Sequence, residues 1–122
     1  MATILIEHDL SKDLTMVKAR GEMTASDFYT LAAHCVSKGA TGLILWDLLG
    51  ANICELSSDE ILMIATRTKK IVPKDGKTAF VVGTPCDFGV GRMLEAHSDV
   101  AQITPEFRAF RKMDDAKKWL GV

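Results

Sequence analysis

The chain has 122 residues, of which 48% are hydrophobic and 25% are charged, and its formal net charge is −1. A chain of this length buries roughly two-thirds of its unfolded surface, and its composition is that of an ordinary soluble globular protein. A net charge this close to zero argues against nonspecific nucleic-acid binding as the main activity, so no nucleic-acid partner is expected. We predict one domain over residues 1–122.

The cysteines Cys35, Cys54 and Cys86 are odd in number and form no CxxC pair. This usage is typical of reduced thiols in a cytosolic protein and speaks against a disulfide framework. Charged residues follow the N-terminus too closely for residues 1–8 to begin a signal peptide. No apolar run approaches the length of a membrane span. The expected location is therefore cytoplasmic.

The first third of the chain predicts a hairpin followed by a helix. Residues 2–8 and 13–20 have the alternation of two strands joined by a polar turn. Thr24 is a suitable N-cap for a helix, and the apolar residues after it recur with helical spacing. Gly39 or Gly42 is expected to end that helix.

Strands and helices alternate along the rest of the chain. Val90, Met93, Leu94 and His97 are expected on one side of the helix at 87–101, with His97 at the border of its apolar face. The order ββαβαβαβα implies an α/β fold, with one mixed sheet of about five strands, an N-terminal hairpin and right-handed parallel crossovers. The further elements are predicted at 43–46, 57–72, 78–83, 87–101 and 107–111, with a last helix capped by Asp114.

Residues 83–92 contain three glycines between a predicted strand and a predicted helix. Phe88 stands where a phosphate-binding Walker loop requires glycine. A structural turn with tight helix packing is therefore favoured over nucleotide binding. The alternative is an anion or small ligand at this helix start, contacted by Gly89, Gly91 and Arg92.

Acidic residues and serines gather after the central strand. Asp47 is expected to end that strand, at the sheet edge where open α/β folds bind ligands and partners, and to brace its loop by hydrogen bonds. Ser57 and Glu60 form a capping-box pattern, which stabilises a helix by about 1 kcal/mol. The alternative is a cap that also acts as a switch, because a phosphate on Ser57 or Ser58 would add about −2 charge close to Glu55.

Patterns for catalysis or metal binding are weak. The three histidines are scattered, with no pair at metal-ligand spacing and no HExxH motif. Cys86 lies at a predicted helix start, which favours a thiolate, but no histidine base neighbours it in sequence. We therefore predict no enzymatic activity, no metal and no cofactor.

Three motifs add to this element order. They are Leu45-Trp-Asp-Leu48, Gly89-Val-Gly-Arg-Met93, and Phe110-Arg-Lys-Met-Asp-Asp-Ala116 followed by Trp119-Leu120. Together they resemble the SpoIIAA-like family, small bacterial domains of the STAS type, over nearly the whole chain. In STAS-type anti-sigma-factor antagonists, a strand ending in Asp-Leu leads to Asp-Ser-Ser at a helix start, and a partner kinase phosphorylates the first serine. The resemblance implies that role for Ser57 or Ser58.

The serine motif departs from the family pattern at two positions. Leu56 stands between Glu55 and Ser57, and Asp59 stands where the family has glycine. The departure favours the SpoIIAA-like branch over a true antagonist. That branch also resembles the CRAL-TRIO lipid-transfer fold, which implies an apolar pocket or association with a membrane surface.

A basic run gives this lipid alternative some independent support. Met63 lies off the core stripe of the 57–72 helix, and the basic run follows it, so an apolar patch rimmed by cations could contact anionic lipid. A solvated basic loop is the favoured explanation. The candidate membrane-surface residues are Arg67, Lys69, Lys70 and Lys74.

The sequence thus predicts a non-enzymatic regulatory or ligand-binding module. The first hypothesis is protein interaction through Asp47, Glu55, Ser57 and Ser58. The second is binding of a lipid-like apolar ligand or an anionic membrane surface, with the 57–72 helix as a mobile lid and the protein peripheral to the membrane. An exposed edge in so small a sheet favours a homodimer.

Overall fold

A computed structural model describes residues 3–38, 41–71, 76–100 and 106–122. The order of its elements confirms the predicted ββαβαβαβα arrangement and the α/β fold class. The elements are β1 (Thr3–Asp9), a 3-10 turn η1 (Leu10–Lys12), β2 (Leu14–Glu22), α1 (Ala25–Lys38), β3 (Leu43–Asn52), α2 (Ser58–Ile71), β4 (Lys77–Val82), α3 (Pro85–Val100), β5 (Glu106–Phe110) and α4 (Met113–Leu120).

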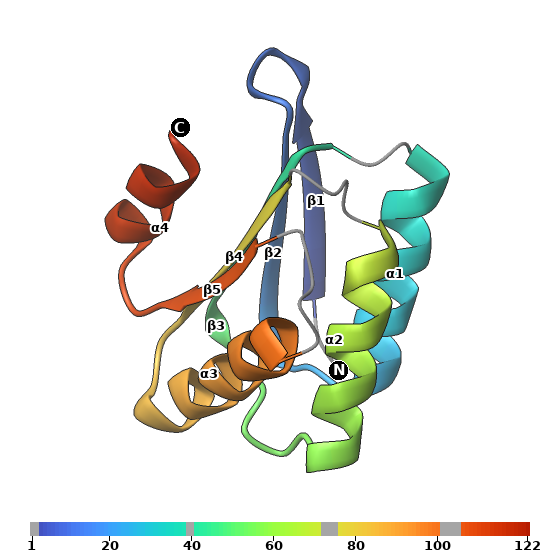
Figure 1. The fold of residues 1–122 in the computed structure, drawn as a ribbon, viewed down its shortest axis with the longest axis vertical. Coiled ribbons are helices and arrows are strands. Elements are labelled where there is room, and N and C mark those ends of the chain that lie inside the picture. Colours follow the sequence, from blue (N-terminus) through green and yellow to red (C-terminus); the bar gives the residue numbers. More distant parts are fainter. Residues whose placement is uncertain (1–2, 39–40, 72–75, 101–105) are drawn as a thin grey trace.

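The five strands form one mixed sheet in the order β1-β2-β3-β4-β5. β1 is antiparallel to β2, and each later strand is parallel to the one before it. Because each crossover moves one strand along in the same direction, right-handed connections must place α1, α2 and α3 on one face of the sheet. Figure 1 shows these three helices together on one side and α4 on the other.

Aromatic side chains fill the centre of the three-helix side. Trp46 on β3 and Phe80 on β4 are buried, and their ring centroids lie 5.1 Å apart. Phe28 of α1 packs on Trp46 at 5.3 Å, and Phe107 of β5 packs on Phe80 at 4.6 Å. Pairs of this geometry contribute about 0.5–1.5 kcal/mol each beyond the area that they bury. The cluster therefore joins α1 to both the central strands and the β5 edge.

The exposure of Met93 contradicts the prediction that this residue lies on the apolar, inner face of α3. Val90 and Leu94 are buried as expected, but Met93 is 39% exposed. Gly91 lies against the sheet instead, and a Cβ placed on it would come within 2.8 Å of the Ala109 Cβ. The absence of a side chain at Gly91 lets α3 approach β5 closely, and this contact sets which side of the helix turns outward.

The short helix α4 covers part of the opposite face. Ala116 and Leu120 are buried in a second core that includes Leu45 of β3. Lys77 of β4 donates a hydrogen bond from Nζ to the Trp119 carbonyl oxygen at 3.3 Å and lies 5.2 Å from the Trp119 ring centroid. A cation at this distance from an indole ring adds to the attachment of α4.

The predicted cap of α4 is wrong. The helix begins at Met113, and its N-cap is Lys112, whose side chain makes no capping hydrogen bond. Asp114 lies in the first turn instead, where its negative charge still interacts favourably with the helix dipole.

The two glycines of α3 give a matched test of this packing. We expect Gly91→Ala to lower the free energy of unfolding by about 1–3 kcal/mol, because its methyl group would collide with Ala109. A Cβ at Gly89 meets no atom within 4 Å, so Gly89→Ala should raise the free energy of unfolding by about 0.5–1 kcal/mol. Urea unfolding of both variants measures the difference, and equal effects would contradict the close contact of α3 with β5.

Candidate functional site

The prediction that β3 ends at Asp47 is wrong, because the strand continues to Asn52. Lys18 pairs with Asp47, but Arg20 pairs with Gly50, so β3 carries one extra residue opposite β2. This β-bulge lets a strand keep its pairing through a local irregularity. Asp47 accepts a hydrogen bond at Oδ1 from the backbone N–H of Leu49 at 3.2 Å, so it braces the bulge rather than a loop.

Asp47 lies on the α4 side of the sheet. Leu45 belongs to the core beneath α4, and residues two apart in a strand share a face. The side chain of Asp47 lines a small pocket with Lys18, Arg20 and Leu49 on this face. The structure therefore separates Asp47 from the other predicted interaction residues, which follow the end of β3.

Of the four helices that follow the carboxyl ends of parallel strands, α1, α2 and α3 each begin with a polar cap. Ser57 and Glu60 form the predicted capping box. The Ser57 N–H donates to Glu60 Oε1 at 2.9 Å, and the Glu60 N–H donates to Ser57 Oγ at 3.2 Å. Thr24 caps α1 as predicted, since the Asp27 N–H donates to Thr24 Oγ1 at 3.3 Å. The bonds at Ser57 set how the chain enters α2.

Asp87 in the first turn of α3 holds the loop that precedes α2. Its side chain is 2% exposed, and its Oδ1 accepts the backbone N–H of Ile53 at 3.1 Å. The Asp87 N–H in turn donates to Thr84 Oγ1 at 3.1 Å. Sequence reasoning missed this anchor, although the spacing of Thr84 and Asp87 is itself a helix-start signal. The bond to Ile53 fastens the end of β3 to the start of α3.

A disulfide bond between Cys54 and Cys86 fastens the same two segments, so the prediction of reduced thiols is wrong for this pair. The Cα atoms are 5.7 Å apart, within the range that a disulfide spans. The residues are 32 positions apart in sequence. They meet because β3 and β4 are parallel neighbours, so the segments that follow the two strands leave the sheet side by side.

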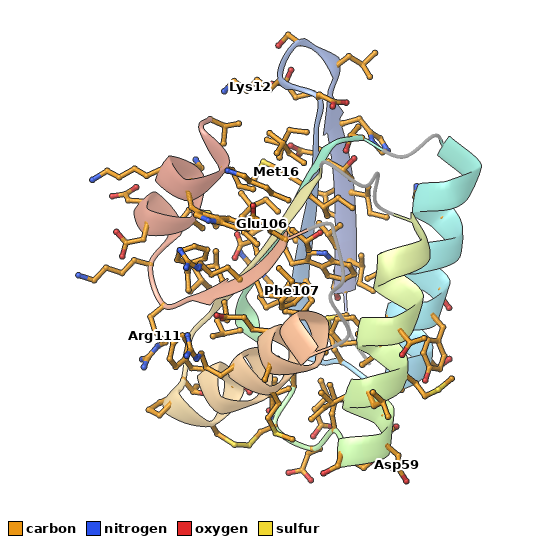
Figure 2. All side chains as sticks on the ribbon, viewed as in Figure 1. Lys12, Met16, Asp59, Glu106, Phe107 and Arg111 are labelled. Carbon is orange, nitrogen blue, oxygen red and sulfur yellow. A yellow bond between two sulfur atoms is a disulfide. The ribbon has the colours of Figure 1, made fainter. Side chains whose placement is uncertain are left out.

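The start of α2 presents a mixed surface to solvent. Ser57, Ser58 and Asp59 are exposed, and Figure 2 shows Asp59 pointing outward at the end of the molecule remote from Lys12 on the hairpin tip. Leu62 and Met63 of the next turn are 46% and 42% exposed. We define the α2-start surface as Glu55, Ser57, Ser58, Asp59, Leu62 and Met63.

Acidic side chains extend from this surface toward α1. Glu22, Glu55 and Glu60 line a pocket of about 270 Å³, together with Met23 and Leu56. A cationic side chain of a partner would complement these carboxylates.

Arg92 lies beside Glu95 rather than at the start of α3. Its Nη1 is 3.2 Å from Glu95 Oε1, and the other carboxylate oxygen of Glu95 accepts the N–H of Ala109 at 3.2 Å. The helix start is capped from within, because the Phe88 N–H donates to the Thr84 carbonyl oxygen at 2.9 Å. Contact of an anion with Gly89, Gly91 and Arg92 thus stays a sequence prediction.

Four basic side chains are the sequence-predicted candidates for membrane contact. Lys74 lies outside the described residues, and so do the side chains of Arg67, Lys69 and Lys70. Met63 is exposed, as the pattern of the helix predicted. No helix in the described part of the chain combines the length and apolarity needed to cross a bilayer. The lipid alternative therefore stays a sequence prediction.

Comparison with known proteins finds similarity only in three dimensions. No protein-family model and no curated protein matches the sequence. The crystal structure of an anti-sigma factor antagonist from Mycobacterium paratuberculosis matches with a TM-score of 0.71 and 18% identity, over 100% of this chain and 96% of that one. The chain has a SpoIIAA-like, STAS-type fold.

Two further structures share this SpoIIAA-like fold. An uncharacterised protein from Shewanella loihica PV-4, described as SpoIIAA-like, has a TM-score of 0.59 and 20% identity, over 98% of this chain and 93% of that one. The anti-sigma factor antagonist SpoIIAA in its unphosphorylated form has a TM-score of 0.53 and 13% identity. The match covers 98% of this chain and 100% of the SpoIIAA chain. At identities this low, the structural similarity establishes the fold alone, and the roles of these proteins are their own.

The hydrogen bond from Ile53 to Asp87 predicts that two acidic residues at this loop contribute differently to the stability of the protein. Asp87→Ala should lower the free energy of unfolding by about 1–3 kcal/mol, because it leaves the buried Ile53 N–H unpaired. Glu55→Ala in the exposed part of the loop should change it by less than about 0.5 kcal/mol. Thermal and urea unfolding measure both, and an Asp87→Ala variant as stable as Glu55→Ala would disprove the anchor.

Ser57 and Ser58 also differ in their predicted contributions to the free energy of unfolding. Ser57→Ala removes the cap oxygen, so we expect the free energy of unfolding to fall by about 1 kcal/mol. Ser58 is exposed in the first turn, and Ser58→Ala should stay within about 0.5 kcal/mol of wild type. Urea unfolding compares them, and a reversed order would show that Ser58 is the true cap.

Proposed function

We propose that this protein is a non-enzymatic regulatory module that binds a protein partner through the α2-start surface. The observation that carries the proposal is the pair of exposed apolar side chains, Leu62 and Met63, directly beside exposed Ser58 and Asp59. Apolar anchors with a polar rim are the usual composition of a protein-binding patch. The SpoIIAA-like fold supports the same conclusion, because two of its matches are anti-sigma factor antagonists.

The partner class that we propose is an anti-sigma factor. The protein from Mycobacterium paratuberculosis and SpoIIAA are both named as antagonists of such factors. The carboxylates of Glu22, Glu55 and Glu60 favour a partner segment that carries cationic side chains. Asp47 is left out of the proposed surface, because it lies on the other face of the sheet.

Ser58 is the better proposed phosphorylation site. The Ser57 hydroxyl already accepts a hydrogen bond from Glu60, and a phosphate on Ser57 would have to replace that capping bond. Ser58 is the first residue of α2 and is exposed. A phosphate there interacts favourably with the helix N-terminus, yet it adds about −2 charge to an acidic surface and would weaken docking.

Binding measurements with two matched leucine variants test the proposal. We expect Leu62→Asp to weaken binding to a cognate anti-sigma factor at least tenfold, because it removes an apolar anchor and adds a charge. Leu10→Asp is the control, because Leu10 is 84% exposed at the opposite end of the molecule and its substitution should change affinity less than twofold.

The assay is isothermal titration of each purified variant against the anti-sigma factors encoded in the same genome. Ser58→Asp should weaken binding in the same direction as Leu62→Asp. Absence of binding to every anti-sigma factor, or equal losses for Leu62→Asp and Leu10→Asp, would rule out the proposed surface.

A further inference from the structure

The Cys54–Cys86 disulfide lies at the surface of the molecule, not in either core. Cys86 is exposed and Cys54 is half-buried. Solvent-accessible disulfides are those that external thiols exchange most readily, whereas buried ones act as permanent cross-links. The disulfide also joins the loop before α2 to the first turn of α3. Its oxidation state therefore affects how the α2-start surface is held.

Both linked segments have other attachments that do not need the disulfide. Ile53 is fully buried, and its N–H donates to Asp87. Leu56 is 9% exposed at the far side of the loop. Opening the disulfide would therefore leave Cys54 and Glu55 held only by two turn bonds, from the Cys54 N–H to Asn52 Oδ1 and from the Leu56 N–H to the Ile53 carbonyl oxygen. The sheet and both helices keep their contacts.

The two sulfur atoms differ as leaving groups. Cys86 is the second residue of α3, where the helix N-terminus stabilises a thiolate. Asp87 follows it, but the carboxylate of Asp87 is turned to the Ile53 N–H. Cys54 has no helix terminus of its own and is followed by the acidic Glu55, which disfavours a thiolate. Cleavage that expels Cys86 as the thiolate is thus the easier direction.

We propose that Cys54–Cys86 is a reversible thiol–disulfide exchange site whose co-reactant is a dithiol. A thiolate of the dithiol attacks Sγ of Cys54, the bond between the two sulfurs breaks, and Cys86 leaves as a thiolate that then takes up a proton. The second thiol of the reagent loses its proton and attacks the reagent's own sulfur in the mixed disulfide, so that Cys54 leaves as a thiolate and takes up a proton. The protein disulfide gains two electrons, and the dithiol is oxidised to its own disulfide.

The consequence for regulation rests on the proposed function. In the oxidised protein, the disulfide ties Cys54, the residue before Glu55, to the first turn of α3. In the reduced protein, only the turn bonds of Cys54 and Leu56 limit the movement of Glu55 relative to Ser57 and the first turn of α2. Oxidation state would then set the affinity of the α2-start surface for its partner.

Thiol labelling of the folded protein tests the exchange chemistry without any partner. Wild-type protein is treated with graded dithiothreitol, labelled with a maleimide mass tag, and examined in parallel by circular dichroism and by amide NMR. We expect two additional thiols to become labelled while the circular dichroism spectrum is unchanged. Shifted amide signals should be confined to residues 53–60 and 84–88.

The Cys54→Ala/Cys86→Ala double variant is the matched control, and its spectrum should not respond to dithiothreitol. Three labelled thiols before any reductant is added would overturn the proposal, and so would thiols that become reactive only when the protein unfolds. Partner titration of the oxidised and reduced protein is a separate arm, where we expect at least a fivefold difference in affinity. Equal affinities would overturn the regulatory consequence, and exchange without any partner binding would count against the proposed function alone.

Discussion

The hydrogen bond to the buried carboxylate of Asp87 is the contact on which the α2-start surface depends. This bond, donated by the Ile53 N–H, ties the end of β3 to the start of α3. The loop from Ile53 to Ser57 is then fixed at its first residue by this bond and at its last by the capping box with Glu60. The position of the exposed face of α2 follows from these two attachments. The Cys54–Cys86 disulfide is a third attachment, which reduction would remove.

Much of the fold could be predicted because its signals are local. The alternation of the hairpin, the apolar run at 43–46 and the caps at Thr24 and Ser57 each depend on neighbours within a few residues. The handedness of crossovers then places three helices on one face without any knowledge of side-chain packing. Predictions failed where a long-range contact decides the outcome. The bulge in β3 depends on pairing with β2, and the outward turn of Met93 depends on the contact between Gly91 and β5.

The candidate site was only partly predictable for the same reason. Ser57 and Glu60 are three residues apart, so their reciprocal bonds could be foreseen, whereas Asp87 and Ile53 meet only after β3 and β4 pair. The disulfide depends on the same juxtaposition, and cysteine counting pointed away from it. The apolar run at 43–46 predicts a short strand, which would place Asp47 at the edge of the sheet. The alternation of side chains in the longer strand places it on the opposite face.

Amide hydrogen exchange at Ile53 tests the central claim, that Asp87 holds the loop beneath the α2-start surface. In the oxidised protein, the Ile53 amide should exchange as slowly as the buried amides of β3, because its release requires breaking a bond to a buried carboxylate. The Glu55 amide, in the exposed part of the loop, should exchange much faster. Equal and rapid exchange at Ile53 and Glu55 would contradict the account, since the loop would then be free of α3.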